Sequence, residues 1–368
     1  MIQELYVHNF RCLENFKLSL KDMSSVLIIG KNGVGKTTIA NALAVFQKIG
    51  RGVNRVGQLI ESSDFTRGNK TIPMRFELQV LLNDKLYIYK LAFELPDNFK
   101  EPRILEETIS VDGQIIYSRQ DAEVTLYKNT VNKEAIFFVD WHLVALPVIQ
   151  TQQGEPLHIF QSWLANMLIL SPIPMMMKGD SNGSTLQPDR YVSNFGEWLT
   201  GLLVAYPSAY SLIDNYICSV IPDFDSVQNE LIAKEARNIT VQFKKEQANF
   251  SIDFNQLSDG EKCFFIAAVV IATNKYRHSL FCFWDEPDNY LSISEVGQFV
   301  TTLRRSFKGN GQILVTSHNA QAIEKFSDEN TFILDRKSHL EPTLCKLLEQ
   351  IPKAEDLIAA LILGDITL

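Results

Sequence analysis

Long apolar runs, paired cysteines and an excess of positive charge are all missing from this chain of 368 residues. Its longest apolar run, residues 263–272, is about half as long as a helix must be to cross a bilayer. The sequence does not open with a basic stretch followed by an apolar one, so no signal peptide is indicated. We therefore expect no membrane segment, no membrane partner and a cytoplasmic location.

Cysteine spacing and net charge limit the metals and partners that the chain can have. The five cysteines form no CxxC pair and no Cys/His spacing suited to zinc, so we interpret them as reduced structural thiols. A formal charge of −8 argues against attraction of nucleic acid to the whole surface, although an acidic protein can carry a local basic patch. The sequence has no repeat and no sustained heptad pattern, which excludes long coiled-coil arms.

Short apolar runs indicate the core of the fold. Four of them have the form of strands buried on both faces, at 26–29, 280–284, 313–316 and 331–334. Polar residues follow two of these runs at once, which places chemistry beyond the carboxyl ends of strands, where ligands of open α/β sheets bind. The pattern predicts an α/β fold with a parallel core sheet and flanking helices.

The remaining sequence predicts a β subdomain and a helical lobe. Alternation of apolar and polar residues in 2–10 and 16–20 predicts two strands. The same alternation, interrupted by turn signals, fills 72–127 and predicts an antiparallel sheet beside the core. Helical periodicity extends over 156–220. Within it we expect two clear helices and an irregular or mobile loop between them, at 158–170, 194–205 and 171–189 respectively.

A glycine-rich segment follows the first buried run and precedes a helical pattern at 38–46. It has the spacing GxxxxGK[ST], and strand, loop and helix occur in the order that this phosphate-binding motif requires. Backbone N–H groups of such a loop face the phosphates of a nucleotide. We predict that Lys36 reaches the β and γ phosphates and that the Thr37 hydroxyl coordinates Mg²⁺. The nucleotide-binding residues predicted here are Gly30, Lys31, Asn32, Gly33, Val34, Gly35, Lys36, Thr37 and Thr38.

Two acids follow the buried run 280–284 directly. A strand delivers a carboxylate to a metal in this way, so we predict that Asp285 is a second Mg²⁺ ligand. Glu286 points to the other side of the strand end, where it can orient and deprotonate an attacking water. The alternative interpretation is that two acids before Pro287 only begin a turn.

The segment 257–261 has two interpretations that can both hold. Ser258, with Glu261 three residues later, forms a capping box before an apolar helix. A helix N-terminus that offers a hydroxyl and a glycine N–H is also suited to bind a γ-phosphate. We therefore predict Ser258, Gly260 and Glu261 as nucleotide-binding residues.

Together these segments resemble the nucleotide-binding domain of ATP-binding cassette proteins, in the branch that includes RecF, the SMC-type proteins and the ATPase part of OLD-family nucleases. The opening 7–11 is similar to the start of this branch, and 206–224 is similar to the helical part of its stand-alone predicted ATPases. The resemblance identifies the Walker A motif, the signature, the Walker B motif and the switch histidine as 30–37, 257–262, 281–285 and His318.

The resemblance implies a P-loop NTPase of ABC-ATPase type, with ATP and Mg²⁺ as cofactors and Glu286, His318 and Lys36 as catalytic residues. It also implies that the signature of one chain reaches the phosphate loop of another, so we expect an ATP-dependent head-to-tail homodimer or a higher oligomer. Three parts are expected: an N-terminal part of the ATPase lobe with Walker A and the antiparallel sheet, a helical lobe, and a C-terminal part with the other motifs, at 1–150, 151–225 and 226–368.

Several positions depart from the family pattern or stay open. Asp259 stands where transporters usually have glycine, which adds a negative charge near a triphosphate. For the glutamine that links metal to the helical lobe we choose Gln150, with Gln152 and Gln153 as rivals. Arg11 either contacts nucleotide or forms a surface salt bridge.

The resemblance favours an ATPase sensor or clamp in DNA maintenance, DNA repair or antiviral defence that acts with a separate effector protein. One alternative is the energy-coupling subunit of a transporter, which the D-loop sequence 288–291 and the N-terminal strands disfavour. The other is a slowly hydrolysing ATP-bound scaffold that holds a partner. About fifty residues follow His318, so we expect any nucleic-acid cleavage to come from a partner.

DNA is a further candidate partner, and its contact is expected just after the phosphate-loop helix. A sparse basic stretch lies there, although a solvated helix-and-loop surface explains it as well. Its members are Lys48, Arg51, Arg55, Arg67 and Lys70.

Overall fold

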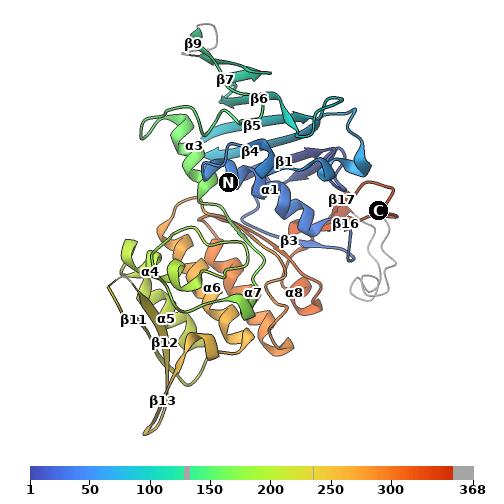
Figure 1. Ribbon diagram of the computed structural model, residues 1–368. Helices are drawn as coiled ribbons and strands as arrows, with labels where there is room; N and C mark the ends of the chain where they lie inside the picture. Colours follow the sequence, from blue (N-terminus) through green and yellow to red (C-terminus); the bar gives the residue numbers. More distant parts are fainter. Residues whose placement is uncertain (128–132, 235, 351–368) are drawn as a thin grey trace. The chain divides into compact units, whose positions relative to one another are not determined.

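The structure is a computed structural model that describes residues 1–127, 133–234 and 236–350, and the chain divides into two compact units (Figure 1). The first unit comprises Met1–Met167 and the chain from Ser327 onward, and the second comprises Leu168–Phe326. The three-part division expected from the sequence stays a prediction. In the described part of the chain, no helix is both long and apolar enough to span a membrane.

The larger sheet of the first unit has eight strands in the order β2-β1-β4-β5-β6-β7-β8-β9, and each pair of neighbours is antiparallel. It confirms the antiparallel sheet predicted for 72–127 and the two strands before the phosphate loop. The strands are β1 Ile2–His8, β2 Phe16–Ser19, β4 Met74–Leu82, β5 Lys85–Glu94, β6 Arg103–Val111, β7 Gln114–Gln120, β8 Glu123–Tyr127 and β9 Lys133–Phe138.

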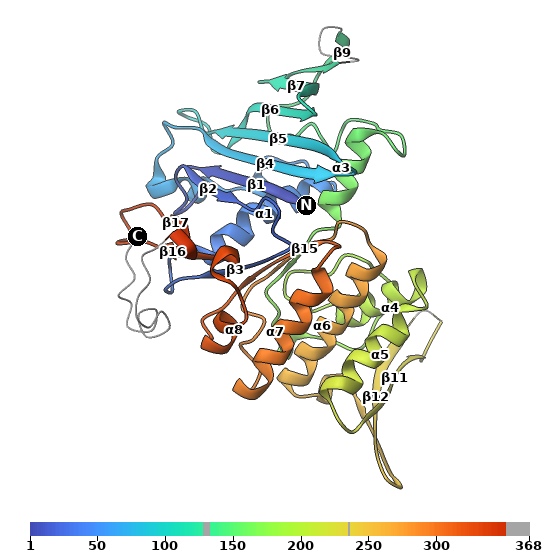
Figure 2. The ribbon, with the colours of Figure 1, turned by 180° about the vertical axis from the view of Figure 1, so that it is seen from behind.

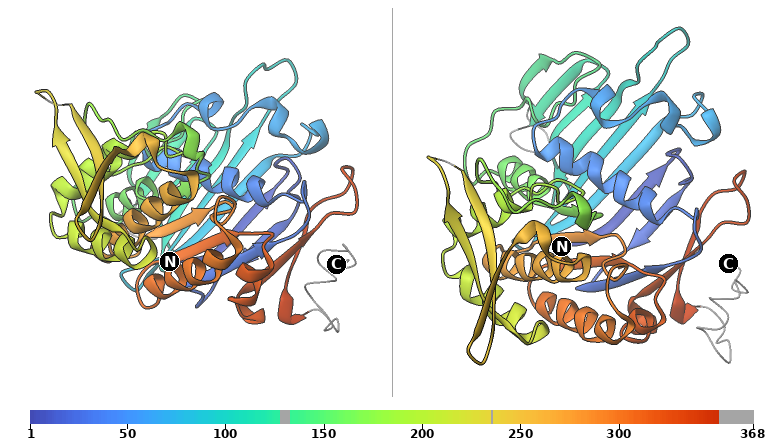
Figure 3. Two further views of the ribbon diagram at one scale, coloured as in Figure 1. Left: turned by 90° about the horizontal axis from the view of Figure 1, so that it is seen from below. Right: turned by 60° about the horizontal axis from the view of Figure 1, so that its bottom comes forward.

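Helices cover one face of this sheet, as Figure 3 shows for α1. Alternate residues of β4 are buried, which is the pattern of a strand with one covered face. Phe46 of α1 packs edge-on against Phe76 of β4, and Phe160 of α3 stacks on Tyr87 of β5. The helices of this unit are α1 Lys36–Gly50, α2 Val56–Leu59 and α3 Pro156–Ala165.

A buried carboxylate fastens the connection that follows the large sheet. Glu107 of β6 is fully buried and accepts hydrogen bonds from the hydroxyls of Tyr89 and Tyr117, at 2.8 and 2.6 Å. The same carboxylate accepts the backbone N–H groups of Ala145 and Leu146, at 2.7 and 3.1 Å. These five residues and Arg119 are called the Glu107 cluster below.

Arg119 completes this cluster from β7. Its guanidinium is fully buried, lies 3.8 Å from the Glu107 carboxylate and donates to the carbonyl oxygens of Asp140 and Leu143. Burial raises the pKa of Tyr89 and Tyr117 well above the ordinary value, so both hydroxyls stay protonated and donate. The segment 139–146 is therefore held to the sheet by polar contacts from two strands, β6 and β7.

A second set of strands in the first unit leads to the phosphate loop. β3 Ser25–Ile29 and β16 Thr331–Asp335 are parallel, and β17 Leu344–Leu347 is antiparallel to β16. Every residue of β3 and β16 is buried, as expected for strands covered on both faces. Both strands agree with runs predicted from the sequence.

The second unit contains three parallel strands, β10 Leu168–Leu170, β14 Phe281–Trp284 and β15 Gln312–Thr316. A separate antiparallel sheet consists of β11 Phe224–Leu231, β12 Arg237–Lys245 and β13 Ala248–Asp253. The helices are α4 Phe195–Ala205, α5 Ala209–Val220, α6 Asp259–Tyr276, α7 Ile293–Phe307 and α8 Ala320–Glu324.

Helix α6 is the centre of this unit. Figure 2 shows it between α7 and α5. Its buried residues face every direction around the helix, which is typical of a helix enclosed on all sides. Its long apolar run is therefore the core of a globular unit.

One predicted helix was partly wrong. The sequence favoured a helix over 158–170, but α3 ends at Ala165, and Leu168–Leu170 form strand β10. A short apolar run is ambiguous between helix and strand, and here parallel pairing with β14 decides the outcome. The helix predicted at 194–205 is confirmed by α4, and the loop before it contains a single helical turn, Pro174–Met176, among irregular backbone.

Candidate functional site

Three glycines shape the loop between β3 and α1. Gly30, Gly33 and Gly35 have φ angles of 151°, 80° and 111°, in the region that side chains disfavour. A Cβ at Gly30 would come within 2.4 Å of the Leu334 carbonyl oxygen. Gly35 is the N-cap of α1 and makes no side-chain cap, and the first turn carries no acid. The N–H groups at this helix end are therefore suited to an anion such as phosphate.

Lys36 lies inside this loop. Its side chain is buried, and Nζ donates to the carbonyl oxygens of Gly30 and Lys31 at 2.8 and 3.2 Å. The Thr37 side chain is on the exposed side of the first turn. An ammonium group placed within a ring of backbone groups can exchange carbonyl partners for phosphate oxygens without leaving its position.

Two residues distant in sequence fasten the loop, and sequence analysis missed both. Thr343 donates its hydroxyl to the Val34 carbonyl at 2.7 Å, and Cys12 Sγ contacts Thr38 Oγ1 at 3.6 Å. Both also lie against Gly35, where a Cβ would meet Cys12 Sγ at 2.8 Å and Thr343 Oγ1 at 3.0 Å. The phosphate-binding loop is thus held in part by two residues that lie outside its sequence motif.

In the second unit, Thr316 joins the ends of β14 and β15. It is fully buried, and its hydroxyl donates to Asp285 Oδ1 at 2.6 Å. Thr316 Oγ1 also accepts the backbone N–H of Glu286 at 2.9 Å. Thr316 therefore fixes both acids at once, one through its carboxylate and one through its backbone.

Glu286 and His318 form a pair beyond these strand ends. His318 Nε2 lies 3.2 Å from Glu286 Oε1, and both side chains are partly exposed. Asn289 Nδ2 donates to the other carboxylate oxygen of Glu286 at 2.6 Å. Glu286 has a φ of 50°, a left-handed conformation that costs a residue with a side chain about 1 kcal/mol or more and is common at functional sites.

Asp288 and Ser317 connect the same two turns at a deeper level. The Ser317 hydroxyl donates to Asp288 Oδ2 at 2.8 Å and accepts the backbone N–H of Asn319 at 2.9 Å. Burial raises the pKa of Asp288, and its Oδ1 has no hydrogen-bond partner within the described residues. Together with Thr316, this contact holds the turn that carries His318 against the turn that carries Glu286.

The N-terminus of α6 confirms the predicted capping box. Ser258 Oγ accepts the backbone N–H of Glu261 at 3.3 Å, and Glu261 Oε2 accepts from the Ser258 backbone at 2.8 Å and from its hydroxyl at 2.7 Å. Ser258 is exposed, so its hydroxyl can also turn to an external acceptor. A Cβ at Gly260 would come within 3.1 Å of the Tyr290 carbonyl oxygen, so the segments predicted as the signature and the D-loop are neighbours in this unit.

Comparisons with known proteins decide the family. The sequence profile of the RecF/RecN/SMC N-terminal domain matches residues 1–339 of this chain. The chain belongs to this family. A comparison with curated proteins gave no match.

Solved structures show that this RecF/RecN/SMC-family chain has the fold of SMC head domains. One is the SmcHead bound to the C-winged helix domain of ScpA, at 14% identity and a TM-score of 0.59, with 95% of this chain and 99% of that chain covered. Another is the Smc head domain with an extended coiled coil bound to the C-terminal domain of ScpA derived from Pyrococcus furiosus, at 13% identity and a TM-score of 0.56, covering 99% and 98%. The resemblance stated from the sequence and the predicted fold class are thus confirmed.

In this RecF/RecN/SMC-family chain, the roles considered for Gln150 and Arg11 stay predictions. Gln150 is exposed in a loop before α3, as are its rivals Gln152 and Gln153. Arg11 forms a salt bridge with Asp64, at 2.8 Å between Nε and Oδ1, which is the second of the two roles considered for it. Its side chain is still 45% exposed.

Internal partners engage most of the basic stretch expected to meet DNA. Arg55 pairs with Glu101 at 3.0 Å, and Arg67 pairs with Glu14. Lys48 and Arg51 donate to backbone carbonyls. Four of the five cations are therefore already used, which weakens the case for this stretch as a phosphate-binding surface.

Gly35→Ala is expected to lower the free energy of unfolding by about 1–3 kcal/mol and to reduce the thermal stabilisation by ATP, because the added Cβ meets Cys12 and Thr343 at a positive φ. Calorimetry with and without ATP-Mg²⁺ measures both effects. Gly52→Ala is the matched control, since Gly52 has a φ of 93° with nothing within 4 Å of an added Cβ. Equal behaviour of the two variants would mean that close contact at Gly35 is unimportant.

Proposed function

We propose that this chain is an ATP-binding and ATP-hydrolysing switch that works as a head-to-tail dimer with a separate effector protein. Membership of the RecF/RecN/SMC N-terminal domain family supports ATP as the ligand. The observation that carries hydrolysis is the Glu286–His318 pair, 3.2 Å apart beyond the ends of two parallel strands. An acid and a histidine at this place in the fold are positioned for proton transfer at a bound ligand.

Each residue has a proposed role in this reaction. Lys36 binds the β and γ phosphates, with the backbone N–H groups of the loop around it. Glu286 accepts a proton from the attacking water, and His318 holds the Glu286 carboxylate in position. Asn289 supports the same carboxylate from its other oxygen. Proton acceptance by a positioned carboxylate contributes about 10²–10⁴-fold to a rate.

The proposed metal is Mg²⁺, held by Thr37 and Asp285. A hydroxyl and a carboxylate are the oxygen donors that this cation prefers, so the residue types fit. Thr316 donates to Asp285 Oδ1, which fixes the orientation of the carboxylate. When bound, Mg²⁺ supplies neutralisation of phosphate charge.

The proposed partners are a second copy of the chain and an effector, with DNA as a further candidate. The exposed N-terminus of α6 supports the second copy, because a helix end with a hydroxyl and a glycine N–H suits the γ-phosphate of a nucleotide held elsewhere. The similar SMC heads that were solved bound to domains of ScpA support a protein effector. Five free cysteines, three of them buried, support a cytoplasmic location.

Ser258→Arg tests the dimer. We expect ATP to stabilise the monomer as in the normal chain, by about 2.7 kcal/mol at a hundredfold excess over the dissociation constant. We expect ATP-dependent dimerisation to be lost, because the bulky side chain blocks approach of the phosphate. Light scattering with and without ATP-Mg²⁺, together with thermal unfolding, measures the two effects.

Ser292→Arg is the control for this experiment. Ser292 caps α7 with Glu295 through the same kind of capping box, so its loss costs a similar amount of helix stability. The control is expected to dimerise. If the Ser258 variant loses ATP binding as a monomer, or if both variants dimerise, Ser258 is only a helix cap.

A further inference from the structure

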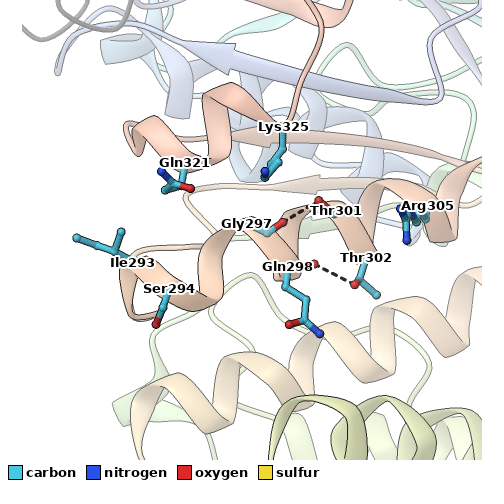
Figure 4. A pocket seen from close by; sticks show the side chains of 9 residues that line it. All are labelled: Ile293, Ser294, Gly297, Gln298, Thr301, Thr302, Arg305, Gln321 and Lys325. Atoms are coloured by element: carbon cyan, nitrogen blue, oxygen red, sulfur yellow. Dashed lines mark hydrogen bonds between the residues drawn. The ribbon is translucent and has the colours of Figure 1, made fainter.

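A groove of about 680 Å³ lies between α7 and α8 of the second unit, outside the residues assigned to the ATP site. Figure 4 shows one polar stripe of α7 along it, with residues spaced three and four apart, from Ser294 to Arg305. Gln321 and Lys325 face this stripe from α8 and its end. The opposite side of α7 is apolar and buried, so the stripe is the exposed surface of an otherwise packed helix.

The groove is cationic in an acidic protein. No carboxylate lines it, whereas Arg305 and Lys325 both do. Neither cation has a hydrogen bond or an ion pair to any residue that the structure describes. Gly297 gives Lys325 room to lie against α7, because a Cβ there would come within 3.2 Å of Lys325 Cε.

Apart from Ile293 and Gly297, the remaining lining consists of amides and hydroxyls. Gln298 and Gln321 offer amide donors from opposite sides, while the hydroxyls of Thr301 and Thr302 donate back to α7 carbonyls at 2.7 and 2.9 Å. Because the threonine donors are already used, an anion in the groove would be bound by the two cations and the two amides. These are side-chain types that contact phosphate groups in nucleic-acid complexes.

We propose that this groove binds the phosphate backbone of double-stranded nucleic acid without reading its sequence. The stripe from Ser294 to Arg305 is about 17 Å long at 1.5 Å per residue, which is about the rise of five base pairs along a duplex axis. The lining contains no aromatic residue, so it offers no platform on which unpaired bases stack. Its single large apolar side chain is Ile293 at one end, which is too little anchor for an acidic peptide.

This inference rests on the nucleic-acid partner of the proposed function and gives it a location. It moves the contact away from the basic stretch after α1, where salt bridges and backbone carbonyls already bind four cations. It does not depend on ATP hydrolysis, because every residue that it uses lies on α7, on α8 or directly after α8.

The test is a double variant, Arg305→Gln with Lys325→Gln, and a labelled short duplex DNA of mixed sequence. Fluorescence anisotropy over a series of salt concentrations gives the slope of log affinity against log salt. Loss of two phosphate contacts is expected to reduce this slope by about 1.8 and to weaken binding roughly tenfold or more at low salt. The control is Lys244→Gln with Lys245→Gln, which removes the same charge from an exposed part of β12 and is expected to keep the normal slope.

Thermal stabilisation by ATP is measured on the same samples and separates this inference from the proposed ATPase. If the normal chain binds DNA and the groove variant binds it with an unchanged salt slope, the groove is not the DNA-binding site. This conclusion holds whether or not ATP stabilises the chain. Equal losses in the groove and control variants, competition by polyglutamate as effective as by DNA, or no DNA binding by the normal chain at low salt also overturn the inference. Absence of ATP stabilisation would instead overturn the proposed switch.

Discussion

Glu286→Gln is expected to lower the rate of ATP hydrolysis by about 10²–10⁴-fold while ATP binding persists. Glutamine has nearly the same shape as glutamate, and its amide oxygen can still accept the hydrogen bond that Asn289 donates to Glu286 at 2.6 Å. The amide cannot accept a proton from water, so the proposed role as a base is removed. Steady-state phosphate release measures the rate, and light scattering in ATP-Mg²⁺ measures the dimer, which we expect to accumulate because hydrolysis no longer separates its subunits.

Glu324→Gln is the control, since it removes the same charge from an exposed position of the same unit. We expect it to turn over ATP at the normal rate. A Glu286 variant with normal turnover would exclude Glu286 as the base. A Glu286 variant that stays monomeric at saturating ATP-Mg²⁺ would count against the dimer. The role of Glu286 as the base would then be judged from the hydrolysis rate alone.

Local pattern was enough to predict the strands that carry the site. β3, β14, β15 and β16 are short, and every residue of each is buried, so their apolar runs stand out against polar flanks. Periodicity alone does not separate such a run from a buried helix, but its short length and the turn residues at its ends favour a strand. The same locality explains why the capping box of α6 could be recognised from two residues.

The contacts that fix the orientation of the site residues could not be predicted from the sequence. Thr316 bonds to Asp285 across 31 positions of sequence, and Thr343 bonds to Val34 across 309. A lone threonine or serine gives no signal of such a partner, because its hydroxyl is satisfied equally well by water or by its own helix. Only the pairing of strands brings these groups together, so a rule based on sequence spacing has nothing to detect.

The Glu107 cluster is a second case of this kind. Glu107 sits in an alternating strand where an acid is normally solvent-facing, and its sequence neighbours Glu106 and Thr108 are not buried. Its partners come from two other strands and from a segment that lies 38 residues after Glu107 itself. The burial of Glu107 could therefore not be predicted from the sequence, although Glu107 holds the connection that leads toward Gln150.

Glu107→Ala is expected to lower the free energy of unfolding by about 3–5 kcal/mol and the midpoint of thermal unfolding by roughly 10 °C. The change leaves the buried Arg119 guanidinium without its carboxylate and leaves the hydroxyls of Tyr89 and Tyr117 without an acceptor. Each buried donor that loses its partner costs about 1–3 kcal/mol, and relaxation or water entry recovers part of the sum. Calorimetry of the normal and variant chains measures the difference.

Glu106→Ala is the matched control on the same strand. Its carboxylate is half exposed and pairs with Arg75 at 3.0 Å, so its loss is expected to cost less than about 1 kcal/mol. If both variants unfold at the same temperature, the buried cluster contributes no more than a surface ion pair. The segment 139–146 would then be held by its buried apolar side chains, of which Val144 and Leu146 are fully enclosed.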